Sequence, residues 1–270
     1  PYPTMVGDVP VVQARSYGKY LGRLVVTFDD AGRVVSAEGA PILLDASVAE
    51  DEAIRARVAE LGAPLEALRA EVVGEAAAAI EGAREVCRVG ECAMGNLVAD
   101  AMLARVADQG VTVALANSGG LRASIDAGPV TRGEVLTVLP FQNTLSTFSV
   151  SGATLAEALE NGASQIEEGA GRFLQVAGLR YAVDPAAPAG ARVSGVEVRL
   201  GGDAWAPLDP AATYLVVSNN YVRQGGDGFA MFEDAADAYD FGPDLADVVA
   251  EFIAANSPYE PATDGRVTVR

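Results

Sequence analysis

The chain of 270 residues contains no histidine, and this absence excludes several kinds of catalytic site. A Ser-His-Asp triad, a Cys-His pair and a zinc site built on imidazole all need a histidine side chain. Any chemistry in this chain must therefore use carboxylates, arginines, hydroxyls and backbone groups, or be supplied by another protein segment.

Basic residues are also scarce, with 19 lysines and arginines against 37 aspartates and glutamates, and the formal net charge is −18. Such a surface repels nucleic-acid backbones and anionic membranes, so no polynucleotide partner is expected. Lysine occurs once, at Lys19, and nearly every cation is an arginine, which can grip phosphate or carboxylate with two hydrogen bonds. The codon bias of a genome would produce the same excess of arginine.

Long hydrophobic runs are absent as well. No apolar run approaches the roughly 20 residues that cross a bilayer, so no membrane span is predicted. The first residues, PYPTMVGDVP, lack the charged and apolar regions of a secretory signal and lead almost at once into a strand-like segment. We therefore expect the sequence to be a truncated or processed piece of a longer protein.

Hydrophobic periodicity divides the chain into three segments. Residues 9–44 alternate as strands do and predict a short antiparallel ribbon. From Ser47 the period changes to that of one long amphipathic helix, which Pro64 should kink or divide. We therefore predict a strand-rich piece at 1–45, a linker helix at 46–73 and a separate domain at 74–270.

The segment from residue 74 onward predicts a mixed domain. Its strands and helices do not alternate strictly, which favours an α+β fold with a mixed sheet over a doubly wound sheet. The expected helices are 96–108, 152–166 and 243–256, and the expected strands are 111–116, 144–151, 179–184, 192–200, 213–219 and 265–270.

Both cysteines lie in the stretch CRVGEC, as Cys87 and Cys92. Two thiols so close in sequence can form a disulfide if the backbone turns back on itself, and a metal site would need more ligands than this pair. A disulfide, the favoured interpretation, implies an oxidising compartment and would hold Arg88 in one direction. The alternative is two unpaired buried thiols.

Two further stretches carry polar and aromatic groups typical of a binding site. LANSGGLRAS follows an apolar strand and places exposed backbone amides, Asn117 and Arg122 at the strand's carboxyl edge, although a glycine cluster can also be a plain turn. Phe141 in VLPFQNT and Phe229 in QGGDGF lie on polar loops. Two loop-borne rings and two arginines would form a slot for a flat base and a cradle for an anion, unless the rings fold back onto the core.

Five ordered motifs carry a family resemblance: ECAMGNLVADAM, NSGGLR, VLPFQNT, FLQVAGLRY and GGDGF. In this order and spacing they resemble the C-terminal substrate-binding domain of the 5′-nucleotidases, a group that includes UDP-sugar hydrolases and ecto-5′-nucleotidases. The resemblance covers residues 74–270. The first strands resemble the end of the same enzymes' N-terminal metallophosphoesterase domain, and the helix resembles their interdomain linker.

The resemblance implies that the catalytic machinery lies outside this sequence. In the family, two divalent metal ions, such as zinc or manganese, are held by Asp, His and Asn in the N-terminal domain, where they activate a water for attack on phosphate. This chain should therefore contain no catalytic residue, bind no metal or other cofactor and be inactive alone, with its own N-terminal catalytic domain as a partner.

The binding residues do carry over by resemblance. Arg88 and Arg122 would contact phosphate, and Asn117 with Gly120 would face the ligand. Phe141 and Phe229 would sandwich the base. Asn143 would bond the edge of the base and Asp234 would accept hydrogen bonds from the ribose. The spacing of Cys87 and Cys92 also matches a disulfide of the animal enzymes.

Together these features predict the nucleotide-binding part of a secreted, periplasmic or cell-surface 5′-nucleotidase, which hydrolyses nucleoside 5′-monophosphates to nucleoside and phosphate. The alternatives are a stand-alone nucleoside-binding module and part of a related UDP-sugar hydrolase or 2′,3′-cyclic-nucleotide phosphodiesterase. The two rings, Phe141 and Phe229, favour a nucleobase as the ligand in each of these readings.

Overall fold

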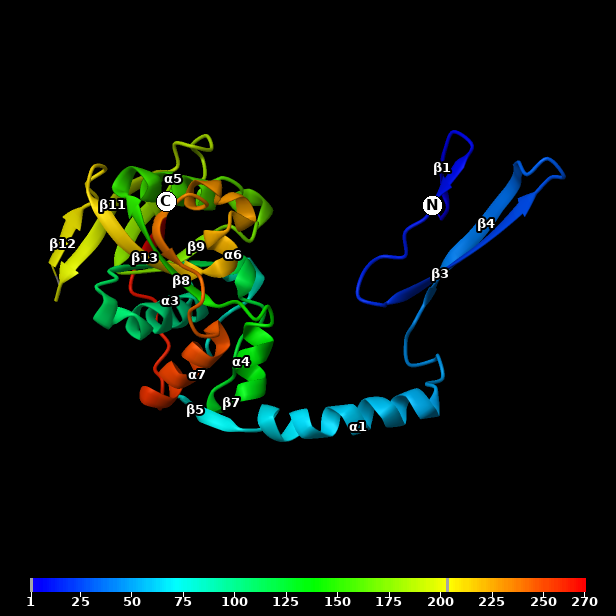
Figure 1. The fold of residues 1–270 in the computed structure, drawn as a ribbon, viewed down its shortest axis with the longest axis horizontal. Coiled ribbons are helices and arrows are strands. Elements are labelled where there is room, and N and C mark those ends of the chain that lie inside the picture. Colours follow the sequence, from blue (N-terminus) through cyan, green and yellow to red (C-terminus); the bar gives the residue numbers. More distant parts are fainter. Residues whose placement is uncertain (1, 203) are drawn as a thin grey trace. The chain divides into compact units, whose positions relative to one another are not determined.

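The computed structural model describes residues 2–202 and 204–270 (Figure 1). The chain divides into two compact units, residues 1–63 and residues 64–270. In the first unit, strands β3 (Tyr20–Phe28) and β4 (Val34–Leu43) pair antiparallel, and the short strands β1 (Thr4–Val6) and β2 (Val9–Val11) form a second pair. The predicted antiparallel ribbon is confirmed.

Helix α1 (Glu52–Arg69) contains the boundary between the two units. Pro64 lies inside this helix and does not divide it, although the sequence allowed for a division. The predicted linker at 46–73 remains a prediction. The apolar positions that repeat along α1 are all exposed: Ile54, Val58, Leu61, Leu65 and Leu68.

The second unit is built on a mixed five-stranded sheet of order β14-β8-β13-β6-β9. Strand β13 runs parallel to β6, and the other pairings in this sheet are antiparallel, so the predicted α+β fold with a mixed sheet is confirmed. The strands are β6 (Val113–Asn117), β8 (Leu145–Ser151), β9 (Leu174–Ala177), β13 (Thr213–Asn219) and β14 (Ala236–Tyr239).

Two smaller sheets accompany the central one. One has the order β12-β11-β10-β15, and the other pairs β5 with β7. Their bounds are β5 (Val72–Ala76), β7 (Gly128–Thr131), β10 (Leu179–Val183), β11 (Val193–Gly201), β12 (Ala204–Pro207) and β15 (Val267–Val269). The helices are α2 (Arg84–Cys87), α3 (Ala93–Arg105), α4 (Arg132–Val138), α5 (Gly152–Ala163), α6 (Asn220–Arg223) and α7 (Leu245–Ala255).

Strand β6 shows how the central sheet separates two hydrophobic cores. Ala114 and Ala116 face the core that includes α3 and α7, whereas Val113 and Leu115 face the core that includes α5. Figure 1 shows α3 and α7 on one side of the central strands and α5 on the other. Because successive side chains of a strand point to opposite faces, β6 is buried on both sides. Its carboxyl end, Asn117, is where the strand can offer a side chain to a ligand.

The helices begin where the sequence provides caps. The side chain of Ser151 accepts a hydrogen bond from the Thr154 amide at the start of α5, and Asp244 caps α7 in the same way. Helix α3 begins at Ala93, three residues before the predicted start, because Cys92 acts as its N-cap. In the described residues, we find no helix with the length and apolar character needed to cross a membrane.

Candidate functional site

A cleft of about 510 Å³ opens at the carboxyl end of β6. Because β13 runs parallel to β6, both strands end at this edge of the sheet, where ligands of mixed and parallel sheets commonly bind. Its lining combines arginines, glycines, amides, aromatic rings and one carboxylate from several stretches of the chain: Arg88, Asn117, Gly119, Gly120, Arg122, Phe141, Asn143, Gly171, Tyr221 and Asp227.

A chain of side-chain hydrogen bonds forms the floor of the cleft. Asn219 Nδ2 donates to Asn117 Oδ1 over 2.9 Å, and Asn117 Nδ2 donates to Asp227 Oδ2 over 2.7 Å. Asn219 Oδ1 accepts from the backbone amide of Val222, which fixes the orientation of the first amide in the chain. Both asparagines are almost fully buried, so the network holds the Asp227 carboxylate in one place.

Tyr221 and Asp227 are coupled directly. The Tyr221 hydroxyl donates to Asp227 Oδ1 over 3.0 Å, and burial together with this bond raises the pKa of the phenol, so the hydroxyl stays a donor at neutral pH. The ring lies against the backbone of Gly226, where a Cβ would come within 2.5 Å of the ring atom Cζ. The absence of a side chain at Gly226 therefore leaves room for the half-exposed Tyr221 ring, which lines the cleft.

A second aromatic ring, Phe141, lies beside an arginine. Phe141 is 55% exposed, and the guanidinium of Arg122 lies 5.7 Å from the centre of its ring. Arg122 Nη1 donates to the Gly119 carbonyl over 3.3 Å, which ties this arginine to the turn after β6. The ring and the cation thus form a wall with one flat apolar surface and one positive end.

Positive charge gathers around Arg88. Its side chain is buried, and Nη1 donates to the Gly169 carbonyl over 3.2 Å. Among the described residues, the buried Nε has no hydrogen-bond partner. Burial, and then the charges of Arg84 and Arg122, lower the pKa of the Arg88 guanidinium. The carboxylates of Asp227 and Glu85 oppose this shift, and an anion in the cleft would further stabilise the Arg88 charge.

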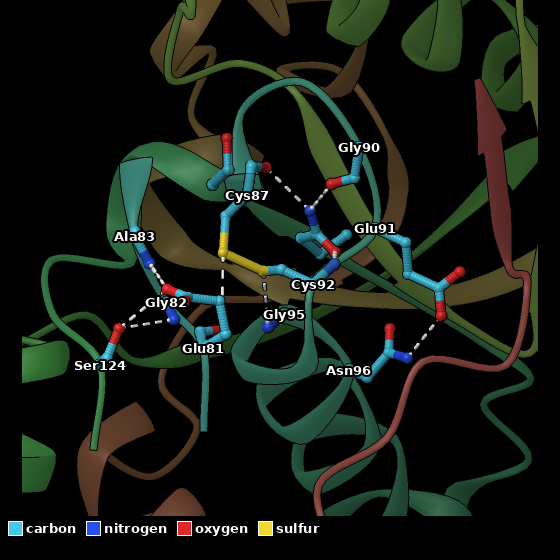
Figure 2. The surroundings of a disulfide bond; sticks show 12 residues. Glu81, Gly82, Ala83, Cys87, Gly90, Glu91, Cys92, Gly95, Asn96 and Ser124 are labelled. Atoms are coloured by element: carbon cyan, nitrogen blue, oxygen red, sulfur yellow. Dashed lines mark hydrogen bonds between the residues drawn. A yellow bond between two sulfur atoms is a disulfide. The ribbon is translucent and has the colours of Figure 1, made fainter. Parts of the chain in front are cut away.

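Arg88 is carried by a disulfide-closed loop (Figure 2). The sulfurs of Cys87 and Cys92 are 2.05 Å apart, so the predicted disulfide is confirmed and the alternative of two free thiols is wrong. Cys92 Sγ also accepts a hydrogen bond from the Gly95 amide at the start of α3. The disulfide therefore lies at the junction between the loop and the first turn of α3, a mostly buried helix.

A family model described as the 5′-nucleotidase C-terminal domain matches residues 72–234. The chain belongs to this family. Over 286 aligned residues it is 36% identical to a 5′-nucleotidase of Diplobatis ommata, with 99% of this chain and 49% of that protein covered. Over 272 residues it is 35% identical to a human 5′-nucleotidase, with 96% and 47% covered.

Two further relatives agree with this assignment. A snake venom 5′-nucleotidase of Naja atra is 34% identical over 274 residues, which cover 96% of this chain and 52% of that protein. The crystal structure of a 5′-nucleotidase precursor from Thermus thermophilus has a TM-score of 0.77 at 42% identity, and the match covers 100% of this chain and 54% of that one. The chain thus spans about half the length of the curated relatives it matches.

Most of the residues predicted for the nucleotidase-domain site line the cleft together. These residues come from three separate stretches of the chain, whose approach to one another local pattern alone does not predict: Arg88, Asn117, Gly120, Arg122, Phe141 and Asn143. Their convergence in one cleft agrees with the site that the resemblance implied. Contact of each side chain with a ligand stays a prediction.

The structure corrects the placement of Phe229. Its side chain is fully buried, and its ring stacks on Phe232 with 5.8 Å between the ring centres and 5° between the planes. Phe232 in turn packs against Phe148 of the central sheet. The expectation that a glycine-rich loop presents Phe229 to a ligand is therefore wrong. The loop turns its ring back into the core of this nucleotidase domain.

Asp234 is also misplaced by the sequence interpretation. Its side chain is exposed and does not belong to the lining of the cleft. Asp227, seven positions earlier in the chain, is the carboxylate that the cleft contains. Asp227 has a left-handed backbone conformation, with φ at 54°, and this conformation turns its side chain back toward Asn117 and Tyr221.

Sequence reasoning missed Tyr221, Asp227, Gly119 and Gly171 as lining residues of this domain. A usable signal existed for Tyr221, since the predicted strand 213–219 ends two residues before it, and strand ends are where side chains reach a ligand. For Gly171 we find no comparable signal in the sequence. It lines the cleft because its carbonyl accepts a 2.8 Å hydrogen bond from the Gly119 amide, a contact between distant segments.

Reduction of the Cys87–Cys92 disulfide should lower the stability of the nucleotidase domain. The two cysteines are five positions apart, and closure of so short a loop contributes about 2 kcal/mol to unfolding free energy by its effect on the unfolded chain. Urea unfolding with and without a phosphine reductant measures this loss. The Cys87→Ser/Cys92→Ser variant is the control, because the chain has no other cysteine for the reductant to attack. An unchanged midpoint for the reduced parent chain would contradict the prediction.

Proposed function

We propose that this chain is the nucleotide-binding part of a 5′-nucleotidase, a phosphomonoesterase that releases a nucleoside and phosphate from a nucleoside 5′-monophosphate. The observation that carries the proposal is the composition of the cleft. It combines two half-exposed aromatic rings, a held carboxylate and a cluster of arginines, which are the groups that a base, a ribose and a phosphate need.

The base is proposed to lie against Phe141 and Tyr221. Both rings line the cleft and about half of each is exposed, so a flat heterocycle can cover them. Stacking of a base on an aromatic side chain contributes about 1–3 kcal/mol and tolerates different bases. Asn117 and Asn143 line the same cleft, and an amide can both donate to and accept from the edge of a base.

The ribose and the phosphate are proposed to occupy the polar end. Asp227 takes the role that the sequence interpretation gave to Asp234, because an ionised carboxylate accepts hydrogen bonds from ribose hydroxyls. Arg88 and Arg122 are the proposed phosphate ligands. Arg88 lines the cleft and its arginine neighbours destabilise its charge, which the negative charge of a phosphate would offset.

Hydrolysis itself is proposed to take place at metals held by the N-terminal domain of the parent enzyme. Within residues 2–202 and 204–270, no cluster of three or more Cys, Asp or Glu side chains could hold a metal ion. Two divalent metal ions, such as zinc or manganese, would activate the attacking water in the parent enzyme. The role of this domain is to bind the nucleoside part and so to position the phosphate.

A location outside the cytoplasm is part of the proposal. A disulfide persists in oxidising compartments, and one of the named relatives is a snake venom enzyme. We propose the extracellular space, the periplasm or the cell surface as the site of action, which would give the enzyme access to nucleotides outside the cell.

Calorimetric titration of the 270-residue chain with AMP and with adenosine tests the proposed function. We expect both ligands to bind saturably. Arg88→Ala should lower the affinity for AMP about 10- to 100-fold, because a charge-assisted hydrogen bond contributes about 1.5–3 kcal/mol. The affinity for adenosine, which has no phosphate, should change little. Arg105→Ala, which removes an exposed arginine of α3 outside the cleft, is the matched control. Failure of the unmodified chain to bind either ligand would overturn the proposal.

A further inference from the structure

The loop that carries Arg88 is held by the side chain of one buried residue, Gln175. Gln175 Nε2 donates to the carbonyls of Cys87 and Gly90, each over 2.8 Å, and Gln175 Oε1 accepts from the Cys92 amide over 3.2 Å. Gln175 belongs to β9 and is fully buried. The carbonyls of Cys87 and Gly90 therefore share the two hydrogens of one amide group.

Helix α3 leaves space for this amide. A Cβ at Gly95 would overlap the side-chain atoms of Gln175, so the glycine permits the close approach of α3 and β9. A buried amide is costly unless its hydrogen bonds are made, whereas an apolar side chain of the same size would fill the space without that requirement. Both amide hydrogens and the amide oxygen of Gln175 are used on one loop, which indicates a role in fixing the conformation of that loop.

Few side-chain contacts hold the orientation of Arg88. The side chain makes one hydrogen bond to the Gly169 carbonyl, its Nε has no partner among the described residues, and Arg84 and Arg122 repel it. The disulfide fixes the distance between the two ends of the loop, and the amides of Arg88 and Val89 donate to the carbonyls of Arg84 and Val86 in the preceding turn. The far end of the loop, at Gly90 and Cys92, is held by Gln175. The bonds to Gln175 hold the peptide plane before Arg88, through the Cys87 carbonyl, and the two planes at the end of the loop, through the Gly90 carbonyl and the Cys92 amide.

We propose that Gln175 is a positioning residue, which acts through the loop 87–92 to aim the Arg88 guanidinium at the phosphate of the ligand. Gln175 is not in the lining of the cleft and therefore acts only through Arg88. This inference rests on the proposed function, because it takes a nucleoside monophosphate as the ligand. It adds a buried glutamine on β9 to the determinants of how strongly the site distinguishes a nucleotide from its nucleoside.

Gln175→Met separates a positioning role from a purely structural one. Methionine has the same length and no hydrogen-bonding amide, so the loop loses all three bonds while the volume is kept. In calorimetric titration we expect AMP affinity to fall about tenfold and adenosine affinity to stay within about twofold, as the loss of one well-aimed charged hydrogen bond predicts. Val176→Ala is the control. It removes buried volume from the next residue of β9, which faces the opposite core. This control should leave unchanged the ratio of the affinity for AMP to the affinity for adenosine, called the AMP-to-adenosine ratio below.

A double-mutant cycle completes the test. If Gln175 acts through Arg88, Gln175→Met should not change the AMP-to-adenosine ratio further in the Arg88→Ala background. Three outcomes would overturn the inference and leave the proposed function in place. The first is a further decrease of the ratio when Gln175→Met is added to Arg88→Ala. The others concern Gln175→Met alone: an equal loss of both affinities, or an unchanged ratio. Absence of binding of both ligands to the unmodified chain would overturn the proposed function and the inference with it. If Gln175→Met does not fold, Gln175→Asn, which shortens the reach by one methylene, is measured in the same way and is expected to lower the ratio.

Discussion

Replacement of Phe229 by alanine should lower the unfolding free energy by about 3–5 kcal/mol, the range for truncation of a buried phenylalanine. Phe229 is fully buried, stacks on Phe232 and belongs to the core that also contains Phe148. Truncation removes these contacts and leaves a cavity that the surrounding sheet and helices cannot fill. Urea unfolding followed by circular dichroism measures the loss.

The same variant separates the two interpretations of the QGGDGF stretch. If Phe229 belongs only to the core, the folded fraction of Phe229→Ala should bind adenosine with nearly unchanged affinity. Phe229→Leu keeps most of the side-chain volume and should destabilise the domain less, so its ligand affinity can be measured on a folded protein. A large loss of adenosine affinity with little loss of stability would restore the sequence-based expectation that the Phe229 ring stacks on the base.

Local pattern was sufficient to predict most elements of the fold. The apolar run around Val113 predicts a strand buried on both faces, and β6 has alternate residues in two cores. Ser151 and Asp244 precede apolar helical repeats, and both residues cap the helices that follow. These outcomes depend on residues close to one another in the sequence, which is why the sequence alone can specify them.

The error at Phe229 has a non-local cause. An aromatic residue after three glycines in a polar stretch has the local pattern of an exposed loop residue. Its burial depends on Phe148, which lies on a strand far away in the sequence and forms part of the surface that receives it. No local signal carries that information, so only the assembled core shows which way the ring turns.

The candidate site also contains residues that the sequence suggested and residues that only the tertiary structure reveals. The resemblance placed Arg88, Asn117 and Phe141, but the physical pattern of each stretch was equally consistent with a turn or a core residue. The role of Asp227 depends on its hydrogen bond to Asn117, 110 positions earlier, and on a left-handed backbone that the sequence DG permits but does not require. The placement of these side chains in one cleft therefore follows from tertiary contacts.

Replacement of Tyr221 by alanine should have the largest effect on ligand affinity. The variant removes a half-exposed ring that lies along the Gly226 backbone at the wall of the cleft. We expect the affinities for adenosine and AMP to fall equally, by about 1–3 kcal/mol or roughly 5- to 150-fold, because both ligands contain the base. Titration calorimetry measures both affinities. Tyr239→Ala, which removes another half-exposed tyrosine outside the cleft, is the matched control and should change neither affinity.

Tyr221→Phe divides the effect between the ring and the hydroxyl. The phenylalanine keeps the ring on Gly226 and removes both hydrogen bonds of the hydroxyl, the one to Asp227 Oδ1 and the one from the Asp227 amide. The bond from Asn117 to Asp227 Oδ2 remains. If stacking dominates, Tyr221→Phe should keep most of the adenosine affinity that Tyr221→Ala loses. Equal losses in the two variants would instead assign the effect to the held Asp227 carboxylate. Unchanged affinity in both would contradict the placement of the base against Tyr221, because a ring that covers a bound base cannot be removed without cost.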